Sequence, residues 1–119
     1  MVHEVGAGTS LTALVRSARD DGRQVLVVPA GATVAQSLDW FAESLRLPEW
    51  FGRNLDALAD CLHDLAEEDP HEGTDGRVLV WDRVAALKVV DPDGFDGIRS
   101  VLVEVEDEHP SLAVVVVDR

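Results

Sequence analysis

The chain has 119 residues, 46% of them hydrophobic, so it can fold as one domain around its own core. Its single cysteine, Cys61, excludes an internal disulfide framework, and no apolar stretch is long enough to cross a membrane. The formal net charge of −13 disfavours nucleic acid as a partner and favours a basic protein, although on charge alone solubility is the better explanation. Residues 1–10 are polar and glycine-rich, unlike a secretory leader, so we expect a cytoplasmic protein.

The first predicted elements are a helix and a strand. Residues 11–20 place Leu11, Leu14 and Val15 at helical spacing. Gly22 follows, where a helix can end. We therefore expect a short helix inside an N-terminal extension, residues 1–23. Residues 24–31 (QVLVVPAG) are a β-branched run closed by proline and glycine, which is typical of a strand buried on both faces.

Two helices and a connection are predicted next. Thr33 begins a Thr-x-x-Gln capping pattern, and apolar residues at spacings of three and four follow it, which predicts a helix ended by Pro48. Asn54 is a predicted N-cap of a second helix. Its apolar stripe comprises Leu55, Leu58, Leu62 and Leu65. Residues 67–77 combine proline, two glycines and five acids without periodicity, which predicts a solvated connection within one domain.

The remaining elements define the fold class. Residues 77–82 (RVLVWD) predict a second strand and residues 84–90 a short helix. Asp91 and Pro92 are suited to the start of a further helix, which Pro110 ends before a third strand, LAVVVV. This alternation predicts an α/β fold with a small three-stranded parallel sheet packed with helices. There is no glycine-rich phosphate loop, so no nucleotide cofactor is expected.

Three carboxylates recur at every fourth position of the predicted second helix. They belong to Asp56, Asp60 and Asp64 and share one face. Like charges at this spacing destabilise a helix by about 0.2–0.5 kcal/mol per pair, partly offset for Asp56 near the positively polarised N-terminus. The stripe alone is most simply a solvated face of an acidic protein.

Three buried or structural side chains are also predicted. Cys61 lies between core leucines and is expected to be a buried, unreactive thiol. Trp40 lies beside the apolar stripe of the first long helix, and Trp81 ends the second strand. We expect both tryptophans to be structural, because aromatic side chains bury large areas.

Residues 47–62 (LPEWFGRNLDALADCL) closely resemble the signature of the barstar family of ribonuclease inhibitors. That signature has Leu-Pro, an aromatic pair, Gly, Asn, then Leu-Asp-Ala-Leu and Asp-Cys-Leu. In order of elements the resemblance covers about residues 24–119 and implies a barstar-like domain that is not an enzyme and needs no metal or cofactor. It further implies a monomer that forms a 1:1 complex with a cationic, guanyl-specific, barnase-like ribonuclease or a ribonuclease toxin domain.

The resemblance also assigns roles to single residues. Asp60 matches the carboxylate that takes the place of an RNA phosphate, Asp56 matches a second interface acid, and Trp50 has the aromatic position of the binding loop. A further acid on the last helix maps to Glu106 or Asp107, of which we take Asp107. The implied nuclease-binding residues are Trp50, Gly52, Asn54, Leu55, Asp56, Ala59, Asp60, His63 and Asp107.

The sequence departs from the family's namesake at three of these positions or close to them. Ala59 and Leu65 stand where the namesake has tryptophans, and His63 replaces a hydroxyl residue. Loss of aromatic contacts implies weaker binding or another nuclease. The acids are kept, which preserves the mechanism that the resemblance implies.

Two other functions fit the acidic stripe. Asp56, Asp60 and Asp64, with His63, could hold a divalent cation in a metal-binding protein or enzyme, because Mg²⁺ and Mn²⁺ prefer oxygen ligands. Against this, His63 lies one residue off the stripe, and no second ligand cluster is visible in the sequence. A general acidic adaptor or DNA mimic would bind many basic proteins in a salt-labile way, whereas an inhibitor selects one nuclease.

Overall fold

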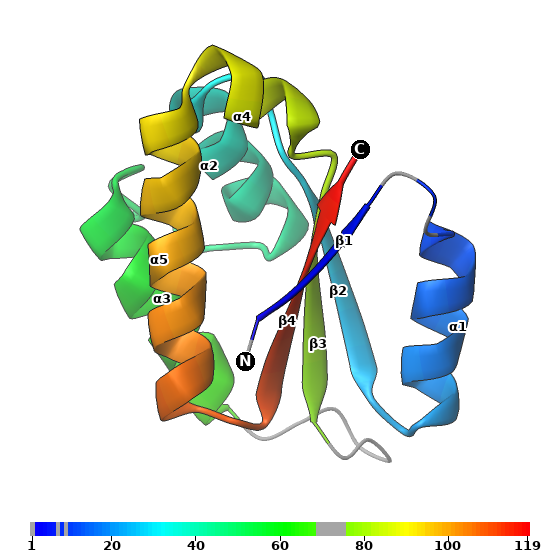
Figure 1. Ribbon diagram of the computed structural model, residues 1–119. Coiled ribbons are helices and arrows are strands. Elements are labelled where there is room, and N and C mark those ends of the chain that lie inside the picture. The colour runs from blue at the N-terminus through cyan, green and yellow to red at the C-terminus, as the bar shows by residue number, and fades with distance from the viewer. Residues whose placement is uncertain (1, 7, 9, 69–75) are drawn as a thin grey trace.

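The computed structural model describes residues 2–6, 8, 10–68 and 76–119. The chain has an α/β fold with one parallel sheet, in the strand order β1-β4-β3-β2 (Figure 1). Most of the predicted connection over residues 67–77 lies outside the described residues. The elements are β1 (His3–Gly6), α1 (Leu11–Asp20), β2 (Gln24–Pro29), α2 (Val34–Ser44), α3 (Leu55–Glu67), β3 (Arg77–Asp82), α4 (Ala85–Val90), α5 (Pro92–Glu108) and β4 (Leu112–Asp118).

The prediction of three strands was wrong, because the sheet has a fourth. Strand β1 pairs in parallel with β4, with His3 opposite Val115 and Gly6 opposite Asp118. Its sequence, HEVG, has one aliphatic residue in four positions, so it carries no alternating or continuous apolar pattern. The hydrogen-bonding edge of β4 makes this segment a strand, and that edge is distant in sequence.

The strand burial predicted from apolar runs holds for β3 and fails for β2. Every residue of β3 is buried, since β2 and β4 flank it. Strand β2 lies at the sheet edge, where Val28 alone is buried and Val27 is 37% exposed. Pro29 is suited to the end of such an edge strand, because it has no backbone N–H to donate to a neighbour.

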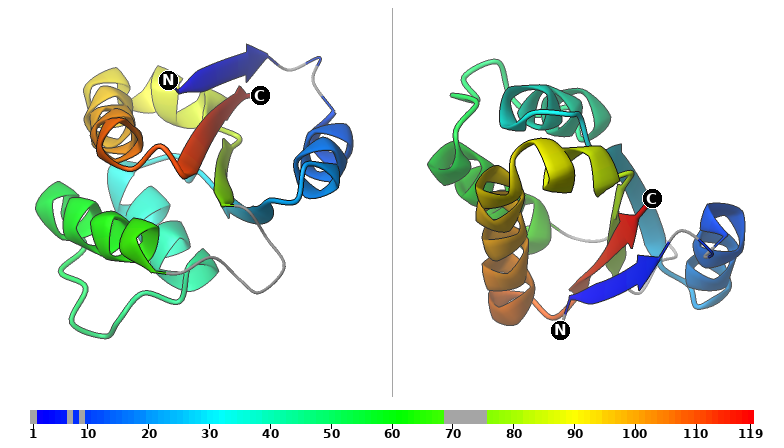
Figure 2. Two further views of the ribbon diagram at one scale, coloured as in Figure 1. Left: turned by 90° about the horizontal axis from the view of Figure 1, so that it is seen from below. Right: turned by 45° about the horizontal axis from the view of Figure 1, so that its top comes forward.

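Helices cover both faces of the sheet. Figure 2 shows α1 on one side of the strands and α3 and α5 on the other. Successive side chains of β3 alternate between these faces: Leu79 and Trp81 lie in the larger core with the long helices, whereas Val78 and Val80 pack with Ala18 of α1. No helix within the described ranges is long and apolar enough to span a membrane.

One of the two tryptophan predictions is correct. Trp81 is fully buried and its ring stacks on Phe95, with 5.4 Å between the centroids. Trp40 is 41% exposed, so it is not part of the core. The position of Trp40 next to an apolar stripe was therefore not enough to bury it.

The predicted helix starts are formed by side-chain caps. The Thr33 hydroxyl accepts a hydrogen bond from the Gln36 N–H at 3.1 Å, and the Gln36 side chain accepts one from the Ala32 N–H at 3.0 Å. The Asp91 carboxylate accepts from the Gly94 N–H at 2.9 Å, and Pro92 is the first residue of α5. These caps satisfy amides that have no partner within the helix.

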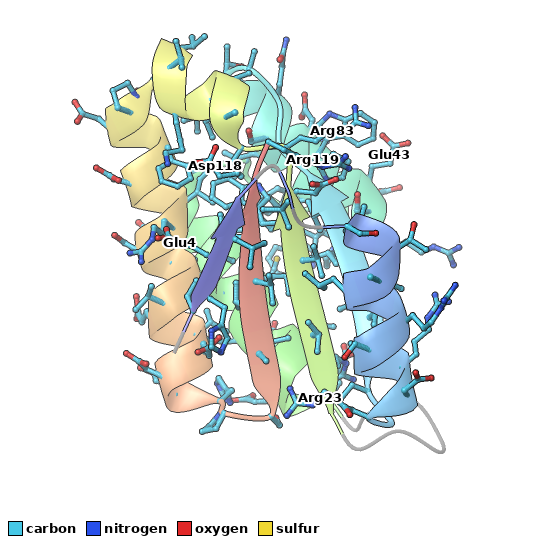
Figure 3. The ribbon with its side chains drawn as sticks, turned by 45° about the vertical axis from the view of Figure 1, so that its right-hand side comes forward. Glu4, Arg23, Glu43, Arg83, Asp118 and Arg119 are labelled. Atoms are coloured by element: carbon cyan, nitrogen blue, oxygen red, sulfur yellow. The ribbon has the colours of Figure 1, made fainter. Side chains whose placement is uncertain are left out.

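An ion pair between a buried aspartate and an exposed arginine closes the end of the sheet where β3 and β4 finish. Figure 3 labels Arg119 and Arg83 at this end. Asp82 is buried, and its two oxygens accept hydrogen bonds from Nε and Nη2 of Arg119, each at 2.8 Å. The hydrogen bonds from Arg119 hold the pKa of Asp82 below its ordinary value, although burial alone would raise it; the charges of Arg119 and Arg83 act in the same lowering direction.

Asp82→Asn is expected to lower the free energy of unfolding at pH 7 by about 1–2 kcal/mol, because it weakens two charge-assisted hydrogen bonds to a buried carboxylate, while the exposed position of Arg119 allows water to screen part of the loss. The folded-state pKa of Asp82 is depressed, so its stabilising contribution is complete above the unfolded-state pKa of about 3.9 and is lost as the pH falls through the folded-state value. Urea unfolding of the wild-type protein and of Asp82→Asn between pH 7 and pH 3 measures this contribution. If the difference between their free energies of unfolding stayed constant down to pH 3, the assigned role of Asp82 would be contradicted.

Candidate functional site

The loop that follows α2 starts with a left-handed residue. Arg46 has a φ of 51°, the Leu47 N–H donates to the Ala42 carbonyl at 2.9 Å, and the Arg46 N–H donates to the Glu43 carbonyl at 3.4 Å. This is the Schellman pattern of a helix end. The prediction that Pro48 ends this helix was therefore wrong, since α2 already ends at Ser44.

The aromatic pair of the loop has divided roles. Phe51 is 3% exposed and joins the core, and its N–H donates to the Pro48 carbonyl at 2.9 Å. Trp50 is 64% exposed. The buried ring thus fixes the loop, and the neighbouring indole is presented to solvent.

The end of the loop is tied to both adjacent helices. The guanidinium Nε of Arg53 donates to the Asp39 carboxylate of α2 at 2.6 Å. The Asn54 side-chain oxygen accepts from the Ala57 N–H at 2.8 Å, which confirms Asn54 as the N-cap of α3. Gly52 directly precedes Arg53 and is exposed, and a Cβ atom on it would lie 3.1 Å from Nδ2 of Asn54.

Asn54→Ala is expected to lower the free energy of unfolding by about 0.5–2 kcal/mol, because the first turn of α3 loses its cap. Urea unfolding monitored by circular dichroism measures the loss. Asn54→Ser is the matched variant, since serine also caps helices well. Equal destabilisation by Ala and Ser would show that the cap is not the stabilising contact.

The predicted stripe of α3 is exposed, and the opposite side of the helix is buried. Asp56, Asp60 and Asp64 are all exposed, whereas Leu58 and Leu62 have no exposed surface. The buried side also includes Cys61, as predicted. Burial raises the pKa of its thiol, and the charges of Asp64 and Asp60 raise it further, so the thiolate that a nucleophile requires is disfavoured.

Leu55 and Ala59 are partly buried and pack against the main core. Leu55 approaches α5 closely, because a Cβ atom on Gly97 would lie 2.9 Å from its Cδ1. Both predicted site residues therefore contribute to packing in the free protein, and Leu55 positions α3 against α5.

The last helix contributes acids that the sequence did not single out. Glu104 and Glu108 are four residues apart on α5, and their carboxylates lie 4.0 Å from Nε2 and 3.5 Å from Nδ1 of His63. His63 is three residues after Asp60 on α3, which places both on one side of that helix. The spacing of Glu104 and Glu108 was a readable signal. We name Asp56, Asp60, Glu104 and Glu108 the acidic face.

The two acids left open by the resemblance have different surroundings. Glu106 is buried, and its Oε2 accepts a hydrogen bond from the Val114 N–H at 2.6 Å, so it joins α5 to β4. Asp107 is exposed and lines a shallow surface depression with Ser100 and Val103. Of the two, only Asp107 is available to a partner, and its role in binding stays a prediction.

His63 also contacts a histidine to which the sequence assigned no role. Its Nδ1 lies 3.1 Å from Nε2 of His109, the residue that follows α5. In the part of the chain that the structure describes, His63, Glu108 and His109 form the group of potential metal ligands whose ligand atoms lie within 4.8 Å of one another. The set predicted for a cation, Asp56, Asp60, His63 and Asp64, does not form such a group among these residues.

The comparison with known families agrees with this architecture. A family model described as Barstar (barnase inhibitor) matches residues 16–117, which include the loop, α3 and α5. A search of curated proteins finds no match. Because the family model covers most of the sequence, the chain belongs to the barstar family.

Proposed function

We propose that this protein inhibits a ribonuclease by covering its active site with the acidic face and the loop around Trp50. The observation that carries the proposal is that Asp56 and Asp60 are exposed on α3, directly after a loop whose Phe51 is buried in the core and whose Trp50 is exposed. His63 of the same helix lies within 4.0 Å of Glu104 and Glu108, which are exposed on α5. The family's description as barnase inhibitors supports it.

The acidic face has the charge and rigidity that such an inhibitor needs. A ribonuclease active site must be cationic to bind phosphate, and fixed carboxylates can satisfy its arginine, lysine and histidine side chains without offering a bond to cleave. Asp56 and Asp60 are carried by a capped helix whose other side is buried, so little conformational freedom is lost on docking. In this proposal Asp60 occupies the phosphate position and Asp56 pairs with a cation beside it.

The remaining predicted contacts extend this surface. Trp50, with the backbone around Gly52 and Asn54, would contact the rim of the active site, and His63 would lie beside the α5 acids. Asp107 would contact the nuclease at the edge of the surface. The small Ala59 leaves room for a partner that differs from the namesake's target.

We propose a guanyl-specific, barnase-like partner, either a secreted ribonuclease or a ribonuclease toxin domain. The inhibitor would act as a monomer in a 1:1 complex in the cytoplasm of the cell that makes the nuclease. Before export, such a ribonuclease would cleave the RNA of the cell that makes it, so an inhibitor in the same compartment would protect that cell.

The test titrates the purified protein into a panel of microbial ribonucleases while cleavage of a fluorogenic RNA is followed. We expect inhibition of one class that is complete at one equivalent. Basic proteins that are not nucleases form the comparison arm, because a general acidic adaptor would bind them as well. Full inhibition that survives the double variant Asp56→Ala, Asp60→Ala would refute the assigned mechanism.

A further inference from the structure

We propose that His63, Glu108 and His109 form a binding site for one transition-metal ion of the Zn²⁺ type, where α3 meets the C-terminal end of α5. The site goes beyond the proposed inhibition, which requires no metal. It also differs from the cation site considered for Asp56, Asp60, Asp64 and His63, since it shares only His63 with that set and takes its other two ligands from the C-terminal end of α5 and the residue after it.

The distances among the ligand atoms already approach those of a tetrahedral site. Zn–N and Zn–O bonds of about 2.0–2.2 Å place neighbouring tetrahedral ligands roughly 3.3–3.6 Å apart. Nδ1 of His63 lies 3.1 Å from Nε2 of His109 and 3.5 Å from Oε2 of Glu108. All three ligand atoms lie within 4.8 Å of one another, so an ion requires only small side-chain movements.

The two histidines are held in place from different parts of the chain. His63 belongs to α3, directly after the fully buried Leu62, and its side chain is only 22% exposed. The backbone of His109 donates to the Val105 carbonyl and accepts from the Leu112 N–H, both at 2.9 Å, which fixes it between α5 and β4. A helix C-terminus is negatively polarised and favours a cation nearby.

The surroundings also match a histidine-based metal site. A ligating histidine usually donates its other ring N–H to a carboxylate, and Glu104 lies 4.0 Å from Nε2 of His63. An approach of about 1 Å would bring this pair to hydrogen-bond distance. Two imidazoles and one carboxylate favour Zn²⁺, Ni²⁺ or Cu²⁺, whereas Mg²⁺ and Ca²⁺ prefer oxygen ligands alone. The Glu108 side chain is 60% exposed, so water can reach the site and complete the coordination.

The test is a calorimetric titration of Zn²⁺ into tag-free, chelator-treated protein, without any nuclease. We expect one site of micromolar affinity or tighter, weakened at least tenfold in His63→Gln and in His109→Gln. His3→Gln is the matched control, because His3 is exposed on β1 and outside the cluster. Co²⁺ should give the visible absorption of a tetrahedral site, and excess Mg²⁺ should leave Zn²⁺ binding intact.

Near-ultraviolet circular dichroism of the metal-free variants establishes that they are folded, so a lost site is not mistaken for an unfolded chain. Absence of saturable binding, an equal loss in His3→Gln or displacement by Mg²⁺ would each overturn the proposal. Because the titration uses the free protein, its failure does not touch the proposed inhibition, and a failure of inhibition does not touch the metal site.

Discussion

Asp60→Ala is expected to weaken inhibition of the cognate ribonuclease by roughly 30-fold or more. Losing one partner of a buried charge pair at an interface costs about 2–5 kcal/mol, because the other charge is left desolvated and unpaired. About 1.4 kcal/mol corresponds to a tenfold change in affinity. Inhibition constants measured by RNA cleavage for the wild-type and variant proteins test this.

The matched control is Asp20→Ala. Asp20 is an exposed acid at the end of α1, which lies on the opposite face of the sheet from α3 (Figure 2). Both variants remove one negative charge, so long-range attraction of a basic enzyme is reduced alike. If Asp20→Ala reduced inhibition as much as Asp60→Ala, net charge and not contact would explain the inhibition.

Asp60→Ala should weaken inhibition but slightly stabilise the folded free protein. Asp60 is exposed, and its like-charge neighbours Asp56 and Asp64 are one turn away on either side. Removing the central charge relieves two repulsive pairs of about 0.2–0.5 kcal/mol each, so thermal unfolding should shift slightly upward. Acids that destabilise their own helix in the free protein but stabilise the complex are what we expect of a surface that serves binding.

Removal of residues 1–23 is expected to abolish cooperative folding or to remove most of the free energy of unfolding. Helix α1 covers the second face of the sheet, where Val78, Val80 and Val117 are buried with Ala18. Exposing an aliphatic side chain of this kind costs about 1.5–3 kcal/mol, and whole domains are stable by only about 5–15 kcal/mol. Urea unfolding of the full chain and of the fragment 24–119 measures the difference.

A point variant makes the same test without truncation. Ala18→Asp would bury an unpaired carboxylate against Val80 and should destabilise the protein strongly, whereas Ala13→Asp on the exposed side of α1 should not. If residues 1–23 were an extension outside the stable fold, the fragment would keep full stability and both variants would be neutral.

Local patterns predicted much of this molecule correctly. Thr33, Asn54 and Asp91 cap helices as expected, because a cap depends on a side chain and an amide within three residues of each other. The apolar strand at residues 77–82 and the exposed stripe of Asp56 and Asp60 were likewise readable from spacing. The α/β class followed from the alternation of such segments.

The tertiary structure decided what depends on contacts between distant segments. Residues 3–6 became a strand because β4 offers them a free edge, and Val27 of β2 is exposed because its strand is the last of the sheet. Glu106 is buried and unavailable to a partner because its carboxylate accepts a hydrogen bond from the backbone N–H of Val114 in β4. His63 meets Glu108 only because α3 packs on α5. Sequence by itself determined the helices, three of the four strands and the acidic stripe of α3, since these follow from residues a few positions apart. Which acids and histidines share a surface was set by the packing of helices on the sheet, which no local spacing encodes.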